Sequence, residues 1–473
     1  MVTLATRPTE LTLADAAAAL RARALSPVEL TEAYLRRIER WNPTLNAYLT
    51  VTAERALDDA RTAAADLGAG RDRGPLHGLP LALTDLYATA GIRTTAGSKI
   101  LADWVPDTDS AVARRLREAG SVLLGKLNLH EFAFGTTTAN PHFGPTRNPW
   151  SEAHIPGGSS GGAGAAMAAG LAAATMGSDT AGSVRIPAAL CGVVGLKPTY
   201  GRVSKAGMVP LSWTYDHPGP ITRTVEDAAL LLQAIAGYDP DDYSTVRVPV
   251  DDYAADLRRG VVGLRVGVPR AFFFDELDDE VRAAVERALG VLRGLGAAVR
   301  DVALDAAERL MRARALAVTE INEYHAPSVA ARADDFGADL RARFACASSP
   351  TGHELVAVQR LVRGGIEAVR RTLEMVDVLV TPTTVAPAVP VGQERVRYGG
   401  VEEGSLDAYI RCTFPFNAAG LPALSLPCGF TATGLPIGLQ IAGRPFDEAT
   451  VLRVGHAYEQ ATEWHAHRPA GLA

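Results

Sequence analysis

The sequence predicts an α/β fold in which a large sheet is covered by helices on both faces. From about residue 74, short apolar runs alternate with helical segments, as in LPLALTDL, DTDSAVARRLREAG and SVLLGKLN. The chain has 473 residues, of which 47% are hydrophobic and 21% are charged, so it is long enough to bury a sizeable core. No internal repeat with a period of about 20 to 50 residues is visible.

The first segment of the chain is predicted to be helical. Thr12 precedes LADAAAALRARAL, and Ser26-Pro27 precedes VELTEAYLRRIERW. A threonine or serine just before a helix, and a proline at its first position, are typical of helix starts. In both segments apolar residues recur at intervals of three and four. We therefore expect a helical N-terminal layer over residues 1–68.

The α/β core is predicted over residues 74–300 and 376–473. Its first strand is LPLALTDL, where Pro80 is tolerated near the strand start because a missing N–H costs least there. The later elements are a helix at 163–169, a strand ending near Gly177, a helix at 224–237, a strand at 263–270, a helix at 278–296, and strands in MVDVLVTPTTVAPAVP, PALSLPCGF and PIGLQIAGR.

An arginine-rich helical cap is predicted at 305–376, inserted between the two parts of the core and interrupted at ASSPTGHEL. Nothing in the sequence resembles a disordered linker, so the prediction is a single domain over residues 1–473. The cap is expected to form a wall of the substrate pocket, with Tyr324, His325, Phe344 and Arg360 as candidates, although these residue types are more often core or surface residues than contacts.

Composition excludes several classes of protein. The net charge is −6 and the basic residues are scattered, which argues against a nucleic-acid or anionic-membrane partner. The sequence starts without a secretory signal pattern and contains no run of about 18 strongly apolar residues. The four cysteines show no C-x-x-C spacing, so neither a zinc site nor a disulfide framework is indicated. We expect a cytoplasmic protein without a metal or cofactor.

The most unusual composition lies at 156–204. Two glycine-serine clusters, GGSSGG at 157–162 and Gly182-Ser183, flank a helix of small residues and a strand. A lone GGSSGG is more often a turn before a tightly packed helix. A phosphate cradle does not fit, because the terminal Lys-Ser/Thr of a P-loop and the G-x-G-x-x-G spacing are both missing.

Together with DHPGPITRTVEDAA at 216–229 and FNAAGLPALSLPCGFTATGLPIGLQIAGRPFDEATVL at 416–452, this stretch resembles the amidase signature family over most of the chain. The resemblance implies the amidase-signature fold and a serine-dependent enzyme that acts on C–N bonds. It places the acyl-accepting nucleophile on Ser183, in the Gly-Ser-x-Arg segment. It places the serine that bridges the nucleophile to a lysine on Ser159, after a cis peptide bond from Gly158.

The chemistry of the family explains these residue types. A serine hydroxyl needs a partner that removes its proton as it attacks a carbonyl, and the developing oxyanion needs hydrogen-bond donors. The resemblance implies that the donors are the backbone N–H groups of Thr180, Ala181, Gly182 and Ser183. Asp179 and Arg185 are expected to hold this turn by a hydrogen-bonded ion pair, which is a structural role more than a catalytic one.

The base of this mechanism is replaced in the present sequence. In the stretch LPLALTDLYATAG, Thr84 stands where the family has its lysine, and a threonine hydroxyl carries no basic nitrogen. A second departure is Ala88, where the family commonly has aspartate. The relay would therefore run from Ser183 to Ser159 and then stop.

Six other residues are candidates for a substitute base, and a structural role is favoured for each. Four are the chain's only lysines, which all stand in contexts that resemble ordinary family text, and two are histidines close to the motifs in sequence. They are Lys99, Lys126, Lys197, Lys205, His77 and His154.

Three accounts of Thr84 are open. It is a Lys-to-Thr substitution made to trap a substrate, or the mark of a natural pseudo-amidase that binds a carbonyl ligand, or part of a biosynthetic site repurposed for acyl transfer or cyclisation. The second change, Ala88, favours natural divergence over a single substitution made to inactivate the enzyme. The retained Ser159, Ser183 and glycine turn argue against unconstrained divergence of the site. The leading hypothesis is an amidase-type enzyme that acts on a carboxamide or related acyl bond with impaired activity.

The expected partner is a small-molecule amide or acyl substrate, and a homodimer is left open. Glutamine-using amidotransferase subunits are similar to this chain. Where they are expected to carry the acidic residue for the glutamine ammonium, upstream of Asn417, this chain has Ile410, and Asp407 is out of register. A tRNA-linked role is therefore the weaker hypothesis.

Overall fold

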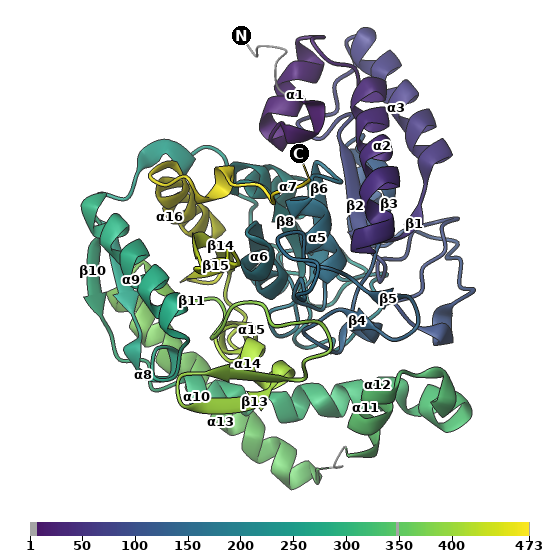
Figure 1. Cartoon of the computed structure of the whole chain (residues 1–473). Helices are drawn as coiled ribbons and strands as arrows, with labels where there is room; N and C mark the ends of the chain where they lie inside the picture. Colours follow the sequence, from purple (N-terminus) through teal and green to yellow (C-terminus); the bar gives the residue numbers. More distant parts are fainter. Residues whose placement is uncertain (1–6, 347–349, 473) are drawn as a thin grey trace.

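A mixed sheet of eleven strands forms the centre of the protein (Figure 1). The computed structural model describes residues 7–346 and 350–472. The strand order is β1-β3-β2-β6-β8-β7-β14-β15-β11-β9-β10, and β12-β13 and β4-β5 form two small separate ribbons. The strands of the large sheet are β1 Tyr48–Val51, β2 Pro80–Thr84, β3 Val122–Leu127, β6 Ala174–Ser178, β7 Val194–Lys197, β8 Pro218–Thr222, β9 Arg265–Val268, β10 Ala298–Asp301, β11 Val378–Pro382, β14 Ala423–Phe430 and β15 Pro436–Gly443. The ribbons are β4 Ala139–Asn140, β5 Gly144–Pro145, β12 Arg395–Tyr398 and β13 Val401–Gly404.

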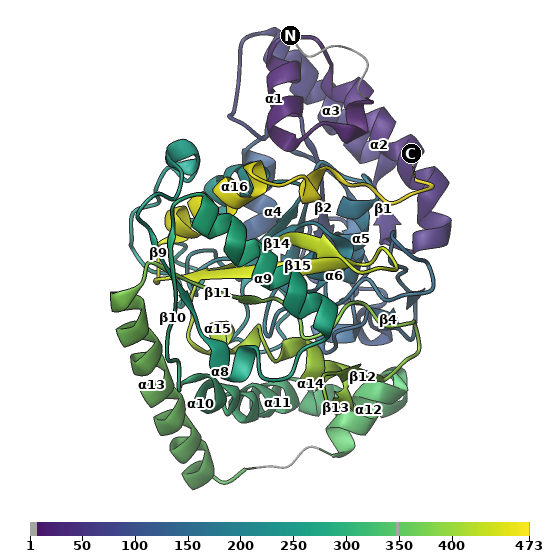
Figure 2. The ribbon, with the colours of Figure 1, turned by 60° about the vertical axis from the view of Figure 1, so that its left-hand side comes forward.

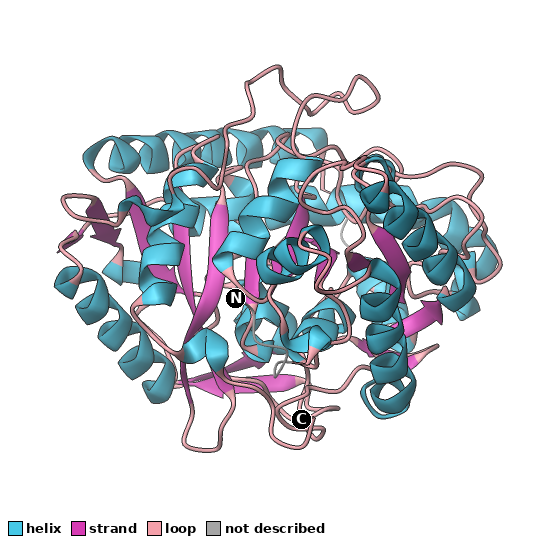
Figure 3. Cartoon of the chain, turned by 90° about the horizontal axis from the view of Figure 1, so that it is seen from above, coloured by secondary structure: helices cyan, strands magenta, loops and turns pink. Residues whose placement is uncertain are grey.

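Helices lie on both sides of these strands (Figure 3). The α-helices are α1 Leu13–Arg21, α2 Pro27–Leu45, α3 Ala53–Gly68, α4 Ala111–Glu118, α5 Gly161–Ala168, α6 Arg185–Cys191, α7 Val225–Ile235, α8 Arg270–Phe273, α9 Asp279–Gly294, α10 Ala307–Met311, α11 Arg314–Arg332, α12 Ala338–Ala345, α13 Gly352–Met375, α14 Ser405–Ile410, α15 Phe414–Ala418 and α16 Glu448–Gln460. Short 3₁₀ turns are η1 Pro8–Glu10, η2 Lys99–Leu101, η3 Glu131–Ala133, η4 Leu257–Arg259, η5 Ala333–Asp335 and η6 Trp464–Ala466. The predicted α/β class with a large mixed sheet is confirmed. None of the described helices is both long enough and apolar enough to cross a membrane.

The first helices begin where the capping residues predict. The Thr12 side chain accepts a hydrogen bond from the backbone N–H of Asp15 at the start of α1. Ser26 and Glu29 form a reciprocal capping box at the start of α2, with Pro27 as its first residue. These contacts satisfy backbone donors that have no partner within the helix, so they define both helix starts.

The site is positioned by two adjacent parallel strands in the interior of the sheet. β2 lies between β3 and β6 and is parallel to both, with Leu83 level with Met176 of β6. Because the carboxyl ends of parallel strands meet at one edge of a sheet, Thr84 at the end of β2 and Ser178 at the end of β6 lie at the same edge. The loop that carries Asp179 to Ser183 leaves from this edge.

The small residues of α5 allow the helix to pack directly on neighbouring backbone. A Cβ atom on Gly162 would lie 2.4 Å from the carbonyl oxygen of Asn128 and 2.7 Å from that of Ala47. A Cβ on Gly164 would meet the Pro187 side chain of α6 at 2.9 Å. A larger residue at Gly164 would push α5, which follows Ser159, away from α6, which follows Ser183, so this glycine keeps the two serine-bearing segments close.

Several strands have no counterpart among the predicted elements. β7 and β8 are short, carry glycine and proline, and are buried along their whole length, so they show no alternation of apolar and polar residues. β1 and β10 have four residues each. The predicted strand at 263–270 is shorter in the structure, as β9 covers Arg265–Val268. The division of the chain into N-terminal layer, core and cap stays a prediction.

A buried carboxyl cluster joins α7 and α16 and makes stability depend on pH. Glu459 is 3% exposed and accepts a hydrogen bond from the backbone N–H of Val225, and Asp227 accepts one from Ala14. Burial raises the pKa of Glu459 to about 8 and that of Asp227 to about 6. The folded protein therefore holds these protons more tightly than the unfolded chain does.

We expect the contribution of these two carboxyls to the free energy of unfolding to fall as pH rises from about 5 to about 8, because the unfolded carboxyls lose their protons first. Glu459→Gln, which keeps a neutral side chain at every pH, should flatten this slope and stabilise the protein by on the order of a few kcal/mol near pH 9. Urea unfolding at several pH values measures the effect. The exposed Glu463→Gln is the matched control, and an unchanged slope in Glu459→Gln would contradict the assignment.

Candidate active site

Ser183 lines a largely apolar cavity at the edge of the sheet. It stands two residues before α6, and the cavity has a volume of about 360 Å³. Apolar side chains from α11 and α14 form much of the wall, namely Ala317, Val318, Ile321, Leu406 and Ile410. Thr136 and Thr180 add polar groups near the serine. A cavity of this size is suited to a small organic molecule.

Ser159 lies beside the Ser183 segment. The peptide bond between Gly158 and Ser159 is cis, as the family resemblance implies. The backbone N–H of the next residue, Ser160, donates to the carbonyl of Ser183 at 3.3 Å. The Ser159 hydroxyl is fully buried and has no hydrogen-bond partner among the described residues. A buried hydroxyl without a partner is costly, so this group is available for another molecule or for a proton relay.

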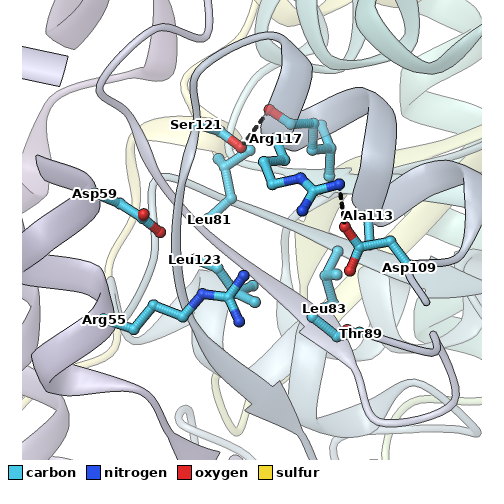
Figure 4. Close-up of a pocket in the computed structure, with 11 residues that line it drawn as sticks. Arg55, Asp59, Leu81, Leu83, Thr89, Asp109, Ala113, Arg117, Ser121 and Leu123 are labelled. Atoms are coloured by element: carbon cyan, nitrogen blue, oxygen red, sulfur yellow. Dashed lines mark hydrogen bonds and ion pairs between the residues drawn. The ribbon is translucent and has the colours of Figure 1, made fainter. Parts of the chain in front are cut away.

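Thr84 is fully buried at the end of β2. Its hydroxyl donates to the carbonyl of Met176 at 2.8 Å, which uses its single proton for a structural contact. Leu81 and Leu83 line a cavity of about 30 Å³ on the opposite face of the strand, too small for an organic substrate (Figure 4). Because strand side chains alternate, Thr84 points away from that cavity.

The side chain of Lys126 on β3 lies on the same face of the sheet as Leu83 of β2, with which Lys126 is paired in the register. Its ammonium donates to the Tyr87 carbonyl and the Thr94 hydroxyl, both at 2.7 Å, and lies 3.3 Å from the carboxylate of Asp85. Burial lowers the pKa of Lys126, although Asp85 opposes this effect. Lys126 is thus a buried structural cation on the face of the sheet opposite Thr84.

The other three lysines have contacts elsewhere. Lys197 is buried and donates to the carbonyls of Pro198 and Leu421. Burial holds the pKa of Lys197 well below its usual range. Lys205 donates to the Tyr200 hydroxyl, and Lys99 is exposed on η2. No hydrogen bond joins any of them to Ser159 or Ser183 in the described structure.

The two candidate histidines also have structural partners. The Nδ1 of His77 accepts from the backbone N–H of Arg73 at 3.2 Å, and the Nδ1 of His154 lies 2.8 Å from the Ser151 hydroxyl. Burial lowers the pKa of both imidazoles. Neither contacts the two serines in the described structure.

An ion pair inside the protein shapes the turn before Ser183. Arg185 donates to both carboxylate oxygens of Asp179 at 2.9 Å, and both side chains are fully buried. Burial by itself would raise the pKa of Asp179, but the Arg185 guanidinium outweighs it and holds this pKa well below the usual range. Arg185 also donates to Gln440 and to the carbonyl of Thr413, and Asn417 donates to Asp179.

The four backbone groups expected to face the oxyanion differ in their contacts. The N–H of Gly182 donates to the Asp179 carboxylate at 2.8 Å, so it is committed to the turn. For the N–H groups of Thr180, Ala181 and Ser183, no acceptor is found among the described residues. Three donors therefore remain for a ligand.

Asp216 is a site residue that the sequence pattern did not single out. It accepts hydrogen bonds from the Thr180 hydroxyl and from the backbone N–H groups of Leu211 and Ser212. Burial raises the pKa of Asp216 to about 6. The carboxyl fixes the side chain of Thr180 at the cavity, but a single aspartate within DHPGP gave no signal for this contact.

The cap supplies the cavity wall with residues other than those predicted. Tyr324, His325, Phe344 and Arg360 do not line the cavity. His325 and Phe344 instead pack in an aromatic cluster with Phe336, where His325 lies 5.7 Å and Phe344 5.3 Å from its ring centroid. Tyr324 and Arg360 are exposed, so all four have the core or surface positions that are more common for their residue types, and none is part of the predicted pocket wall.

The wall residues from the cap are Arg314, Ala317, Val318, Ile321, Arg343 and Cys346. Arg343 stacks over Phe134 at 4.8 Å from the ring centroid, and its Nη1 is buried without a partner among the described residues. In the part of the chain that the structure describes, no group of three or more His, Cys, Asp or Glu side chains is arranged to hold a metal ion.

Comparisons with known proteins define the class of this chain. The Amidase family matches residues 29–452. A glutamyl-tRNA(Gln) amidotransferase subunit from Moorella thermoacetica is 44% identical, over 95% of this chain and 96% of the relative. The structure of 6-aminohexanoate cyclic dimer hydrolase complexed with substrate superimposes with a TM-score of 0.89 at 32% identity, covering 98% of this chain and 100% of that one.

A chain from a vestigial protein complex, described as revealing the evolutionary origins of an s-triazine catabolic enzyme, superimposes with a TM-score of 0.92. It is 34% identical and covers 95% of this chain and 98% of its own. The protein belongs to the amidase family, with the amidase-signature fold. It is an amidase-type enzyme, of the class that hydrolyses amide C–N bonds or transfers across them.

Proposed function

We propose that Ser183 loses its proton, attacks the carbonyl of a carboxamide or related acyl group and becomes acylated as the bond to the leaving group breaks and the leaving amine takes up a proton, and that Thr84 makes this reaction slow. The observation that carries the proposal is the position of Ser183 in the apolar cavity, joined through the N–H of Ser160 to the segment whose Ser159 hydroxyl is buried without a partner among the described residues. Ser159 would pass the proton of Ser183 onward. Thr84 cannot accept it, because its hydroxyl carries no basic nitrogen and donates to Met176.

The backbone N–H groups of Thr180, Ala181 and Ser183 would stabilise the oxyanion of the tetrahedral intermediate. Their freedom from other acceptors within the described chain supports this role. Asp179 and Arg185 would act as positioning residues, because their ion pair holds Gly182 and the segment on both sides of Ser183.

A neutral, apolar substrate region suits the cavity better than glutamine does. Ile410 lies in the wall, at the position where a glutamine-using subunit is expected to carry an acidic residue. Asp407 is paired with Arg314. We therefore place this protein with the small-molecule amidases, although the amidotransferase subunits are its curated relatives. Four free cysteines, three of them buried, fit a reducing cytoplasm.

Active-site labelling tests this function. A fluorophosphonate probe needs only a nucleophilic serine and an oxyanion site, so we expect it to label the wild-type protein slowly and the Ser183→Ala variant not at all. The peripheral Ser151→Ala is the matched control and should label like the wild type. Peptide mapping by mass spectrometry identifies the modified serine.

A pseudo-amidase that only binds a carbonyl ligand is the alternative of another class. The buried contact of Thr84 with Met176 favours it, because this position is built into the fold without a base. It predicts that no probe reaches Ser183 covalently, even after long incubation. Labelling of Ser183 would rule out that alternative, and its complete absence in a folded protein would rule out the enzymatic proposal.

A further inference from the structure

A single helix, α14, separates the catalytic cavity from a second, open groove. Leu406 and Ile410 face the cavity, whereas Asp407 and Arg411, each one residue further along, line the groove. This division follows the helical repeat, in which residues four apart share a face. The groove has a volume of about 830 Å³ and lies along α10, α11 and α14, which are grouped at the lower edge of the molecule (Figures 1 and 2).

Within the described part of the chain, Arg314 is the one residue that lines both the catalytic cavity and the groove. It stands at the first position of α11, and its guanidinium donates to the carboxylate of Asp407 on α14. The two side chains are 38% and 45% exposed, so the pair is half open to solvent and is not locked in the core. Ion pairs at this exposure contribute about 1 kcal/mol or less, so a ligand is able to displace the contact.

The groove carries an excess of positive charge. Its carboxylates are mostly engaged, since Glu403 accepts from the Tyr398 hydroxyl and Asp407 is paired with Arg314. Arg309, Arg312 and Arg411 line the groove without an ion-pair partner among the described residues, against two such carboxylates, Glu308 and Glu403, so the arginines outnumber the carboxylates by one. The Nε of Arg411 is buried and has no hydrogen-bond partner there either.

We infer that the groove binds the anionic end of an extended substrate whose reacting carbonyl lies at Ser183. The apolar middle of this substrate would fill the cavity, and its carboxylate or phosphate would displace Asp407 from Arg314 and meet Arg309, Arg312 and Arg411. The Arg314–Asp407 pair then acts as a gate that opens for an anion and disfavours a neutral end. This substrate class rests on the proposed function of Ser183.

Direct binding tests the groove without requiring turnover. Titration calorimetry of the wild-type protein would compare octanamide with two anionic probes built on the same eight-carbon chain, the monoamide of octanedioic acid and 8-phosphooxyoctanamide. We expect at least one anionic probe to bind about tenfold more tightly than octanamide, and added salt to reduce the difference. The stronger of the two anionic probes identifies the terminal group.

Arginine variants locate the anion. Arg411→Met, which lines the groove alone, should lower the affinity for the anionic probe by about threefold or more and leave octanamide unchanged. Arg314→Met, which also lines the cavity, should lower the affinity for the anionic probe by a larger factor than the affinity for octanamide. Asp407→Asn should raise the anionic affinity, because the competing carboxylate is gone. The exposed Arg370→Met, on α13 and away from both spaces, is the matched control.

Two results would overturn the inference. One is equal affinity for the neutral and anionic probes in the wild-type protein. The other is a preference that survives both groove variants and is lost only in Arg343→Met, which would place the anion inside the cavity. Charge-selective binding without labelling of Ser183 would refute the proposed chemistry and leave the groove in place, so the two failures are distinguishable.

Discussion

The Thr84→Lys variant is expected to hydrolyse simple amides at least about 10²-fold faster than the wild-type protein. The substitution places an amine at the end of β2, at the edge of the sheet where the Ser159 hydroxyl has no partner among the described residues. Because the position is fully buried, desolvation favours the neutral amine, which is the form that accepts a proton. Steady-state rates on a panel of aryl and aliphatic amides measure the gain.

Thr84→Met is the matched control for this experiment. It introduces a side chain of similar length without a basic nitrogen and breaks the same hydrogen bond to Met176. It should stay at the wild-type rate. A gain in Thr84→Met as large as in Thr84→Lys would show that relief of packing, and not a new base, is responsible.

The same variant separates an impaired amidase from a repurposed site. In a site rebuilt for acyl transfer or cyclisation, Thr84 belongs to the shape and hydrogen bonding of the pocket, and a longer lysine would disturb it. A Thr84→Lys protein that unfolds normally, gains no hydrolysis on any amide and no longer binds ligands of the wild type would favour repurposing.

Asp179→Asn is expected to lower the free energy of unfolding by about 3–5 kcal/mol. The variant keeps the shape of the side chain but removes its charge, which leaves the Arg185 guanidinium fully buried without a counter-ion. Gln440, Asn417 and the Thr413 carbonyl still accept from Arg185, but neutral acceptors do not replace the carboxylate. Denaturant titration measures the loss.

An exposed pair provides the control. Asp58 and Arg61 form an ion pair with side chains 74% and 62% exposed, so Asp58→Asn should cost less than about 1 kcal/mol. Replacing both Asp179 and Arg185 by leucine and methionine should recover part of the lost stability, because no uncompensated charge remains. Equal losses in Asp179→Asn and Asp58→Asn would show that the buried pair contributes no more than a surface contact.

Sequence motifs predicted the fold class and most of the long elements. Thr12 and Ser26 carry capping side chains whose partners are three residues away, so the starts of α1 and α2 depend only on local chemistry. The apolar strands β2, β11, β14 and β15 were predicted from runs of residues that are buried on both faces. The short strands β7 and β8 were not, because glycine and proline conceal a strand that its neighbours impose.

The replacement of the family's basic lysine by Thr84 was also visible in the sequence alone. Thr84, Ser159 and Ser183 follow from a motif resemblance, and the absence of an amine at position 84 needs no structure to be recognised. The chemical consequence is a property of the residue type, since no surroundings give threonine a basic nitrogen. The assignment of roles to these residues stays a prediction until the labelling experiment is done.

The surroundings of Thr84, Ser159 and Ser183 are determined by the tertiary structure and could not be predicted from the sequence. Residues far apart in the chain, such as Asp179 and Asn417 or Arg314 and Asp407, meet because strands and helices bring them together, and no spacing in the sequence encodes that contact. The same holds for the face on which a side chain lies: Lys126 and Thr84 are on adjacent strands, yet the register of β3 against β2 sends the lysine to the opposite side. Local sequence determines which residues are chemically able to act, and long-range packing determines which of them act together.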